Sequence, residues 1–266
     1  MTDAAGEPVT SVEVQGRAGR NEYTLDLLYP EPDQPVLRSL PPDNAYIWEA
    51  ARWEGRERPV THWGLGAARW RTRVAPGEYT LRLAATGQRL SQPFKVVRDP
   101  VLSSTTEDLV AGTEMQLRVV EAINEVVDKI NRIEIMRAQV EDLRSEHGSD
   151  RTLDRDLQTI SQLMYETELH FLSRTEMHSD DKWYVEKYRL YMNLVWLLAE
   201  LGGGGGDVAG GVAYRPTNAA VSVFQDRLAE LDAARTDFDR LLAEVAEFNR
   251  THSGRLPAIS DRRPIM

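Results

Sequence analysis

The feature that most constrains this fold is a change of hydrophobic period at residues 95–100, Lys-Val-Val-Arg-Asp-Pro. Before this point apolar and polar residues alternate and Pro-Gly turns separate them, which is typical of half-buried β-strands. After it, apolar residues recur every three or four positions for about 150 residues, which is typical of amphipathic helices. The sequence therefore predicts an α+β protein made of two architectural parts that meet here.

The first part is predicted to be an antiparallel Ig-like β-sandwich over residues 1–100. Apolar residues alternate with polar ones at 23–27 and again at 79–83, where the Pro76-Gly77 turn precedes them. Thr86-Gly87 then reverses the chain into Leu90, Phe94 and Val96. Two hairpin-linked strands and an earlier strand, separated by turn residues, fit a small sandwich.

Four tryptophans lie in the irregular stretch between Pro30 and Pro76, and they are the candidate residues for contact with a ligand or a partner: Trp48, Trp53, Trp63 and Trp70. Exposed indole rings can stack on sugars or bind peptides. The alternative is that these rings fill the core of a small sandwich with long loops. We favour the second interpretation, because aromatic burial dominates the energetics of small cores.

The second part is predicted to be an elongated antiparallel helical bundle of about four helices, coiled-coil-like, over residues 101–252. Residues 103–108 offer N-cap side chains, and the apolar positions from Leu109 to Leu143 meet no proline, so one helix of about 40 residues and about 60 Å is expected. Further helices are expected near 150–174, 180–201 and 216–250, with a flexible glycine-rich connector at 202–211 and a tail at 253–266. The glycines lack the Gly-Lys-Ser/Thr pattern of a phosphate-binding loop.

Composition and charge argue against several kinds of protein function. Residues 1–100 hold 13 basic and 13 acidic side chains, so the remaining 19 basic and 29 acidic ones carry the whole net charge of −10. Such an acidic helical surface argues against nucleic-acid binding, which needs a basic footprint. Cysteine is absent, which excludes thiolate chemistry and disulfides. The most apolar run, 190–201, is too short to span a bilayer, so no membrane insertion is predicted.

The histidines and carboxylates do not form a recognisable catalytic pattern. Glu166 and His170 share a helix face, but a di-iron bundle would need Glu-x-x-His on two helices, and that spacing does not occur. The cluster at 178–181, His-Ser-Asp-Asp, is better explained as helix capping. No catalytic, cofactor-binding or metal-binding residue is predicted, and no cofactor.

Several stretches taken together resemble a known family: residues 19–30, 75–83 and 97–100 in the β part, and 106–109, 215–217, 248–249 and 256–259 in the helical part. They are similar to the C-terminal region of bacterial sortilin-like, BNR-repeat β-propeller proteins, which are often loosely labelled glycosyl hydrolases. The segment 36–66 departs from that pattern, so its tryptophans inherit no role.

The resemblance implies that a β-propeller precedes this region and holds any substrate site. We expect that any hydrolase activity would lie in that domain, which this sequence lacks. The chain would then be a C-terminal fragment, a separately encoded partner or a degenerate paralogue. The family is secreted or periplasmic, although no signal peptide is visible at residues 1–7.

The leading functional hypothesis is a non-enzymatic accessory or protein-interaction module, whose partner is a propeller domain or a second copy of the chain. A first alternative is a non-catalytic fragment or subunit of a secreted glycoside hydrolase or peptidase. A second is a carbohydrate-binding β module on a helical stalk, with the tryptophans as the sugar contacts.

Overall fold

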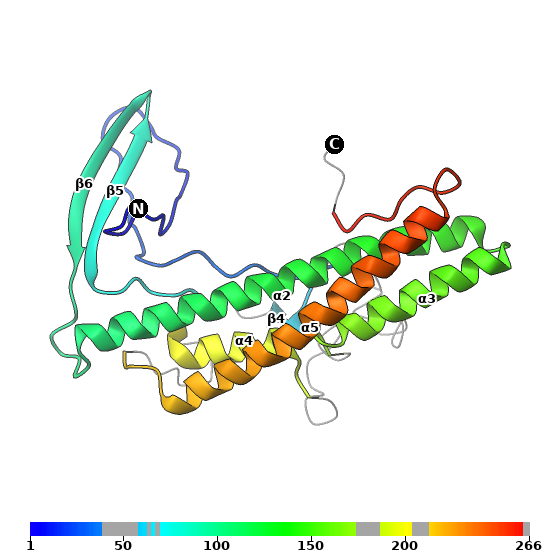
Figure 1. Ribbon diagram of the computed structural model, residues 1–266. Coiled ribbons are helices and arrows are strands. Elements are labelled where there is room, and N and C mark those ends of the chain that lie inside the picture. Colours follow the sequence, from blue (N-terminus) through cyan, green and yellow to red (C-terminus); the bar gives the residue numbers. More distant parts are fainter. Residues whose placement is uncertain (39–57, 63–64, 67–69, 174–186, 204–212, 263–266) are drawn as a thin grey trace. The chain divides into compact units, whose positions relative to one another are not determined.

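A computed structural model describes residues 1–38, 58–62, 65–66, 70–173, 187–203 and 213–262. It is mostly helical: four α-helices, of which the long ones pack together, and a two-stranded antiparallel hairpin (Figure 1). The helices are α2 (Thr106–His147), α3 (Arg151–Glu168), α4 (Leu190–Leu198) and α5 (Asn218–Thr251), and a π-helical turn, Ala199–Gly203, follows α4.

The hairpin consists of β5 (Gly77–Ala85) and β6 (Gln88–Val96). Four further strands have two residues each and form two ladders, with β1 (Val36–Leu37) paired to β2 (Arg58–Pro59) and β3 (Thr61–His62) paired to β4 (Leu65–Gly66). The predicted Ig-like β-sandwich is not seen in the described part of the chain. Residues 23–27 form no strand there. At and just after their end, the Val74 N–H donates to the Leu27 C=O at 3.0 Å and the Tyr29 N–H donates to the Thr72 C=O at 2.8 Å.

The predicted helices agree with the structure where the sequence contained both an apolar stripe and a cap. Helix α2 has 42 residues, close to the expected length. Thr105 and Asp108 cap its start reciprocally, since each accepts the backbone N–H of the other at 3.0–3.1 Å. Asp150 caps α3 by accepting from the N–H groups of Thr152 and Leu153. Of the helix expected at 180–201, the described part is α4.

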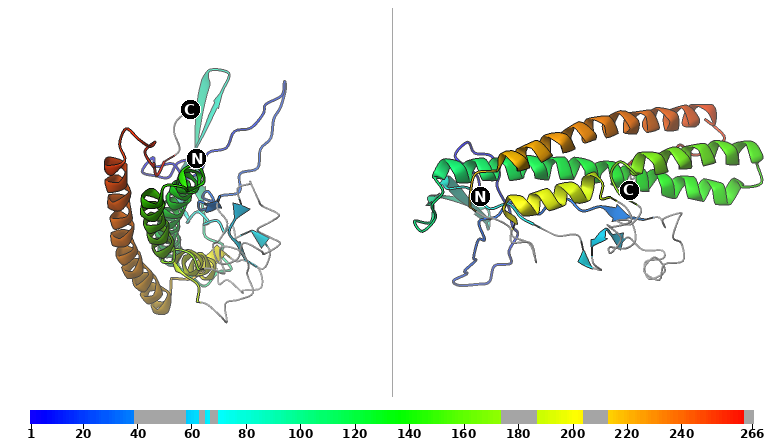
Figure 2. Two further views of the ribbon diagram at one scale, coloured as in Figure 1. Left: turned by 90° about the vertical axis from the view of Figure 1, so that its right-hand side faces the viewer. Right: turned by 90° about the horizontal axis from the view of Figure 1, so that it is seen from below.

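The chain divides into two compact units. One contains residues 1–32, 69–120 and 197–221, and the other contains 33–68, 121–196 and 222–266. The first has a small core of Val9, Val74 and Tyr79, against which Leu27, Tyr29, Phe94 and others pack. In the second, α3 and α5 lie along different sides of α2 (Figure 2).

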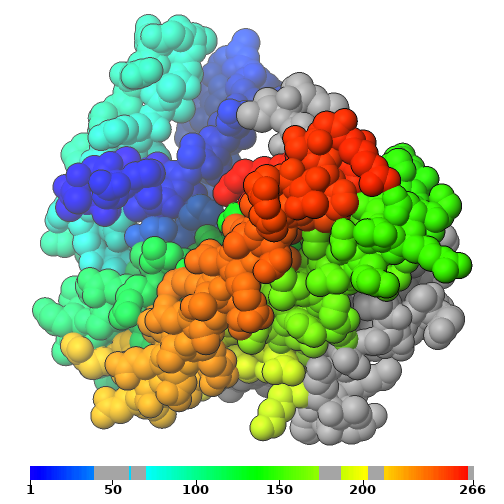
Figure 3. Space-filling model, turned by 45° about the vertical axis from the view of Figure 1, so that its right-hand side comes forward, coloured from blue at the N-terminus to red at the C-terminus, as the bar shows by residue number. Residues whose placement is uncertain are grey.

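The core of the second unit follows from regular stripes of buried residues. On α2 the stripe falls at 123, 126, 130, 133, 137 and 140, and on α5 at 231, 234, 238, 241, 245 and 248. Both stripes alternate steps of three and four residues, which is the spacing of a knobs-into-holes seam. Helix α3 contributes Leu153, Leu157, Ile160 and Met164. The space-filling view shows the surface of α5 (orange) adjoining that of α3 (bright green) (Figure 3).

An extended segment, residues 33–38, lies along α2 and is held by side chains of that helix. Asn124 accepts the backbone N–H of Asp33 at 2.8 Å, Asn131 accepts that of Val36 at 2.7 Å, and Glu134 accepts that of Arg38. Three residues of extended chain and seven residues of helix each span about 10 Å. The spacing of the two asparagines along α2 therefore matches the spacing of the two backbone N–H groups that they bind.

The glycine-rich stretch begins as part of the folded structure. Gly202 has φ of +140° and lies in the π-helical turn, where a Cβ would come within 3.0 Å of the Gln116 amide nitrogen. That amide donates to the Leu201 carbonyl oxygen at 3.1 Å. The flexible connector predicted at 202–211 therefore starts with an ordered glycine, and residues 204–211 of that prediction lie outside the described residues.

The part of the tail that is described folds back on the helices. Asn249 exchanges two hydrogen bonds of 2.8 Å with the backbone of Ile259, whose side chain is buried. Gln139 bonds the backbone of Ser260 in the same reciprocal way, at 2.6 and 3.0 Å. Residues 259–260 are thus held on both α2 and α5.

Burial at Ile130 supplies a direct test of the stripe on α2. Its side chain is 0% exposed, so Ile130→Asp should lower the free energy of unfolding by several kcal/mol, because it buries an unpaired charge. Ile130→Val, the matched control, should lower it by about 0.5–1.5 kcal/mol. Chemical denaturation measures both, and near-equal values for the two variants would show that Ile130 faces solvent.

Candidate functional site

The most unusual charged group in the described residues is Arg137, which occupies a position of the buried stripe on α2. Its Nη2 lies 2.6 Å and its Nη1 3.3 Å from the two carboxylate oxygens of Glu168 on α3, and Nη1 also bonds Glu134. The side chains of Glu134 and Glu168 are only 2% and 1% exposed. Burial alone would lower the pKa of Arg137, but Glu168 and Glu134 more than offset this and raise it above its usual value.

This cluster has the burial of a catalytic site but not its arrangement. The guanidinium of Arg137 is bonded to two carboxylates that are almost fully buried, and the Arg38 N–H takes up a further oxygen of Glu134. Buried, mutually bonded charges of this kind set which residues of two helices face each other. We therefore assign the cluster to the register between α2, α3 and the segment 33–38.

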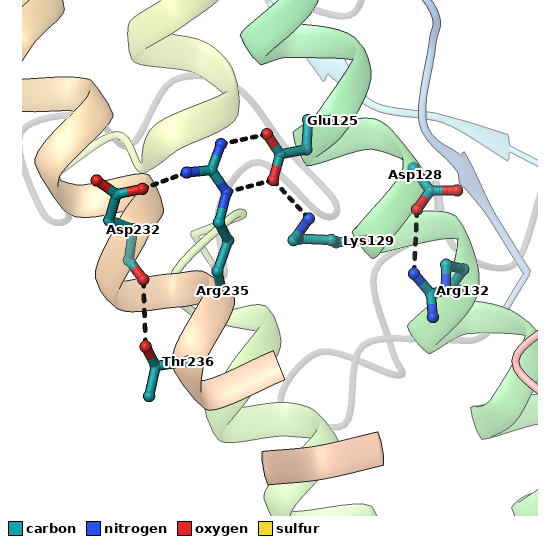
Figure 4. Close-up of polar contacts among 7 residues, drawn as sticks. All are labelled: Glu125, Asp128, Lys129, Arg132, Asp232, Arg235 and Thr236. Carbon is teal, nitrogen blue, oxygen red and sulfur yellow. Dashed lines mark hydrogen bonds and ion pairs between the residues drawn. The ribbon is translucent and has the colours of Figure 1, made fainter. Parts of the chain in front are cut away.

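A second charged network joins α2 to α5 on the surface (Figure 4). Arg235 of α5 donates from Nε and Nη2 to the two oxygens of Glu125 on α2, at 2.7 and 2.5 Å, and Lys129 donates to Glu125 at 2.7 Å. Asp232 binds the remaining side of the guanidinium. The hydrogen bonds from Arg235 lower the pKa of Glu125 to about 2, against a smaller opposing effect of burial.

Two of the described histidines, His170 and His252, each pair with a single carboxylate of another helix. His170 Nε2 lies 3.0 Å from Asp237 of α5, not beside Glu166, and His252 Nε2 lies 3.3 Å from Asp156 of α3. Among the described residues, no group of three or more His, Asp or Glu is arranged to hold a metal ion. None of the helices described has the length and apolarity needed to cross a bilayer.

An open groove of about 1040 Å³ lies between α2, α3 and α5. Arg144, Arg155 and Arg240 line it together with Glu141, whose pKa is raised by burial. The groove holds charges of both signs, and Arg144 is already engaged by Asp154 at 3.1 Å. It lacks a nucleophile held by a base among its lining residues, so it supports no specific reaction.

Of the four tryptophans predicted as contact residues, one lies among the described residues. Trp70 is half-buried and takes part in at least one contact. Trp48, Trp53 and Trp63 lie outside the described residues. The prediction that these rings contact a ligand or a partner therefore stays a prediction.

A surface that sequence reasoning did not single out is the outer half of the β5–β6 hairpin. The register places Tyr79 opposite Phe94 and Leu83 opposite Leu90, with Leu81 between these pairs on the same face. At the base of this face, Tyr79 is buried and its ring lies 5.9 Å from that of Phe94. Farther out, Leu81, Leu83 and Leu90 are 43%, 51% and 62% exposed.

The apolar residues of this face are continuous along β5, while Gln92, opposite Leu81, separates Phe94 from Leu90 on β6, and only the base of the face is covered. The opposite face carries Arg82, paired with Ser91, and Arg89, paired with Ala84. Two-stranded hairpins are marginal alone, because one layer of two strands cannot bury a face. The alternation that predicts a sandwich is present in these residues, while the covering layer is not seen among the described residues.

Comparison of the chain with protein-family models, with curated proteins and with solved structures found no match. The resemblance to the C-terminal region of sortilin-like propeller proteins thus stays a prediction.

The Glu125–Arg235 bond predicts a defined pH dependence. Because folding lowers the pKa of Glu125 from 4.5 to about 2, its contribution is fully present above about pH 4.5 and is lost as the pH falls towards 2. Glu125→Gln should lower the free energy of unfolding by about 1 kcal/mol at pH 7, since the pair is partly exposed.

The difference between wild type and Glu125→Gln should shrink steadily between pH 4.5 and 2 in denaturant titrations. Glu121→Gln, one turn earlier on an exposed part of α2, is the control and should show no such trend. A Glu125→Gln effect that persists unchanged at pH 2 would contradict the assigned pairing.

The cluster around Arg137 predicts a non-additive pair of substitutions. Arg137→Met should cost about 3–5 kcal/mol of unfolding free energy, because it leaves the carboxylates of Glu134 and Glu168 buried without their cation. Arg137→Met combined with Glu168→Met should recover a large part of that loss, since it removes one of the stranded charges. Equilibrium unfolding of the two single variants and the double variant measures the coupling, and strictly additive losses would show that the groups do not interact.

Proposed function

We propose that this chain is a protein-interaction module, and that the outer half of the β5–β6 hairpin is its contact surface. The observation that carries the proposal is the exposure of Leu81, Leu83 and Leu90 on the face that is buried at its base. Exposed apolar residues scattered singly are ordinary, whereas a contiguous patch continuous with a core is typical of an interface.

Apolar burial supplies the driving force for such contact. Covering one leucine side chain fully contributes about 1.5–3 kcal/mol relative to leaving it in water. Leu83 and Leu90 face each other across the two strands, so one partner surface can cover both of them. Tyr79 and Phe94 support this face from below and keep its base rigid.

The backbone of the hairpin favours a partner that is itself a β-structure. Thr2 exchanges two hydrogen bonds of 2.9 Å with Thr80 near the start of β5. Beyond that bridge, no strand among the described residues pairs with the outer edge of either β5 or β6. Unpaired strand edges bind further strands by backbone hydrogen bonding.

The expected partner is the β-propeller domain that the family resemblance implies. Its contact with the hairpin would supply the covering layer that the predicted sandwich requires. The two alternatives, a subunit of a hydrolase and a carbohydrate-binding module, have no specific observation in their favour among the described residues.

The test is complex formation with a propeller-bearing protein encoded next to this chain in its genome. Leu83→Ser with Leu90→Ser should weaken binding at least about tenfold, because the two half-exposed leucines together lose more than about 1.4 kcal/mol of burial. Arg82→Ser with Arg89→Ser alters the opposite face of the same strands and should change binding about twofold at most, measured by isothermal titration calorimetry.

Both pairs of residues are exposed, so both variants should unfold at nearly the wild-type denaturant concentration. Two results would contradict the proposal. One is a complex that keeps its affinity when the leucines are replaced. The other is a wild-type chain that stays monomeric and unbound beside the propeller protein.

A further inference from the structure

A pocket of about 710 Å³ lies where the end of α3, the start of α4 and the middle of α5 meet. Its described lining includes four side chains that are or can become cationic: His170, Lys187, Arg189 and Arg227. Glu230 is the one carboxylate among the described lining residues.

The described lining residues of this pocket have a net positive charge, whereas the chain has a net negative charge. With His170 neutral, the described lining residues carry three positive charges and one negative charge, an excess of two, whereas the chain carries −10. Other cations of the helical part are paired with carboxylates, as Arg235 of α5 is with Glu125 of α2 and Arg255 of the tail is with Asp150 at the start of α3. A gathering of cations in a concave site marks a place where an anion is favoured.

Two of the cations are free to meet a ligand. The side chains of Lys187 and Arg189 are exposed and have no hydrogen-bond or ion-pair partner in the part of the chain that the structure describes. They flank Tyr188 just before the first turn of α4. That helix begins at Leu190, so the positive end of its dipole adds to the same side of the pocket.

Arg227 adds a third, less exposed donor. Its Nη2 lies 2.8 Å from Glu230, while its Nε is buried without a hydrogen-bond partner. A guanidinium carries five N–H donors in a fixed fork, so one carboxylate on one nitrogen leaves most of its donor capacity unused. An oxyanion in the pocket would take up part of that capacity.

His170, which follows the end of α3, also lines the pocket. Its Nε2 lies 3.0 Å from Asp237, which also lies 3.2 Å from Arg240. These contacts hold the ring at the edge of the pocket.

We propose that this pocket binds the phosphate group of a small molecule. A phosphate group carries about −1.5 to −2 charge at pH 7 and three strong acceptor oxygens. The excess of two positive charges therefore matches one phosphate dianion, and three donor side chains match its oxygens. The pocket volume lies in the range typical of small-ligand sites.

Isothermal titration of the full chain with inorganic phosphate and with phenyl phosphate, at constant ionic strength set with chloride, tests the proposal. Wild type should bind at least one of them at millimolar concentration or below. Lys187→Gln with Arg189→Gln should weaken that binding at least about tenfold, because it removes two charge-assisted donors.

Arg151→Gln with Arg155→Gln is the matched control. It removes the same charge from exposed positions of α3 that do not line this pocket, and it should change the affinity about twofold at most. Circular dichroism should show that both double variants keep their helices.

Tighter binding of phenyl phosphate would identify an esterified ligand, and tighter binding of inorganic phosphate would identify the free ion; either supports the pocket. Three results would overturn the proposal: no binding of either compound by wild type, equal weakening in both double variants, or unchanged binding after the Lys187 and Arg189 substitutions. The experiment does not involve the hairpin, so its outcome is separate from that of the protein-interaction proposal.

Discussion

The buried pair between Arg137 and Glu168 is the interaction on which the helical unit depends. Arg137 stands at a position of the α2 stripe where an apolar residue would otherwise be expected, and its guanidinium reaches Glu168 through both terminal nitrogens. A sliding of α3 by one turn along α2 would strand three charges in a core, which costs far more than mismatched apolar contacts. Glu134 extends the constraint to the segment 33–38 through the Arg38 N–H. This cluster thus fixes the register of α2, α3 and the segment 33–38. Burial of the apolar stripes contributes most of the free energy of folding.

The helices were predictable because their determinants are local. The apolar spacing of 109–143 and the N-cap side chains offered by 103–108 act within a few residues, and both are confirmed. Asp150 caps α3 in the same local way. The Arg137 cluster was missed because Glu168 lies 31 residues away, a distance that no period encodes. A signal was nevertheless present: position 137 continues the three-four spacing of 123, 126, 130 and 133, so a charge there had to be buried and paired.

The β part shows what alternation does and does not encode. Tyr79, Leu81 and Leu83 do share one face, as the period of two predicts. That period says which side chains point the same way, but it does not say what covers them. The prediction of a sandwich assumed that the chain covers its own apolar face, whereas in the described residues the outer leucines remain exposed. The same assumption hid the candidate contact surface, because residues assigned to a core were not considered as an interface. The tryptophans were predicted as contact residues instead, because large aromatic residues stand out in a sequence more than leucines do.

The net charge of the chain and the local charge of its pocket have opposite signs. The net charge of −10 argues against a broad basic surface, but it is a sum over the whole molecule. At physiological ionic strength the Debye length is about 8 Å, so an anion in the α3–α4–α5 pocket responds mainly to Lys187, Arg189, Arg227 and Glu230 rather than to distant carboxylates. At low ionic strength that screening is lost, and the acidic surface then opposes the entry of an anion. A pocket of this kind should therefore bind phosphate with a weaker salt dependence than the same cations would give on a neutral protein, because added salt screens the distant repulsion as well as the local attraction.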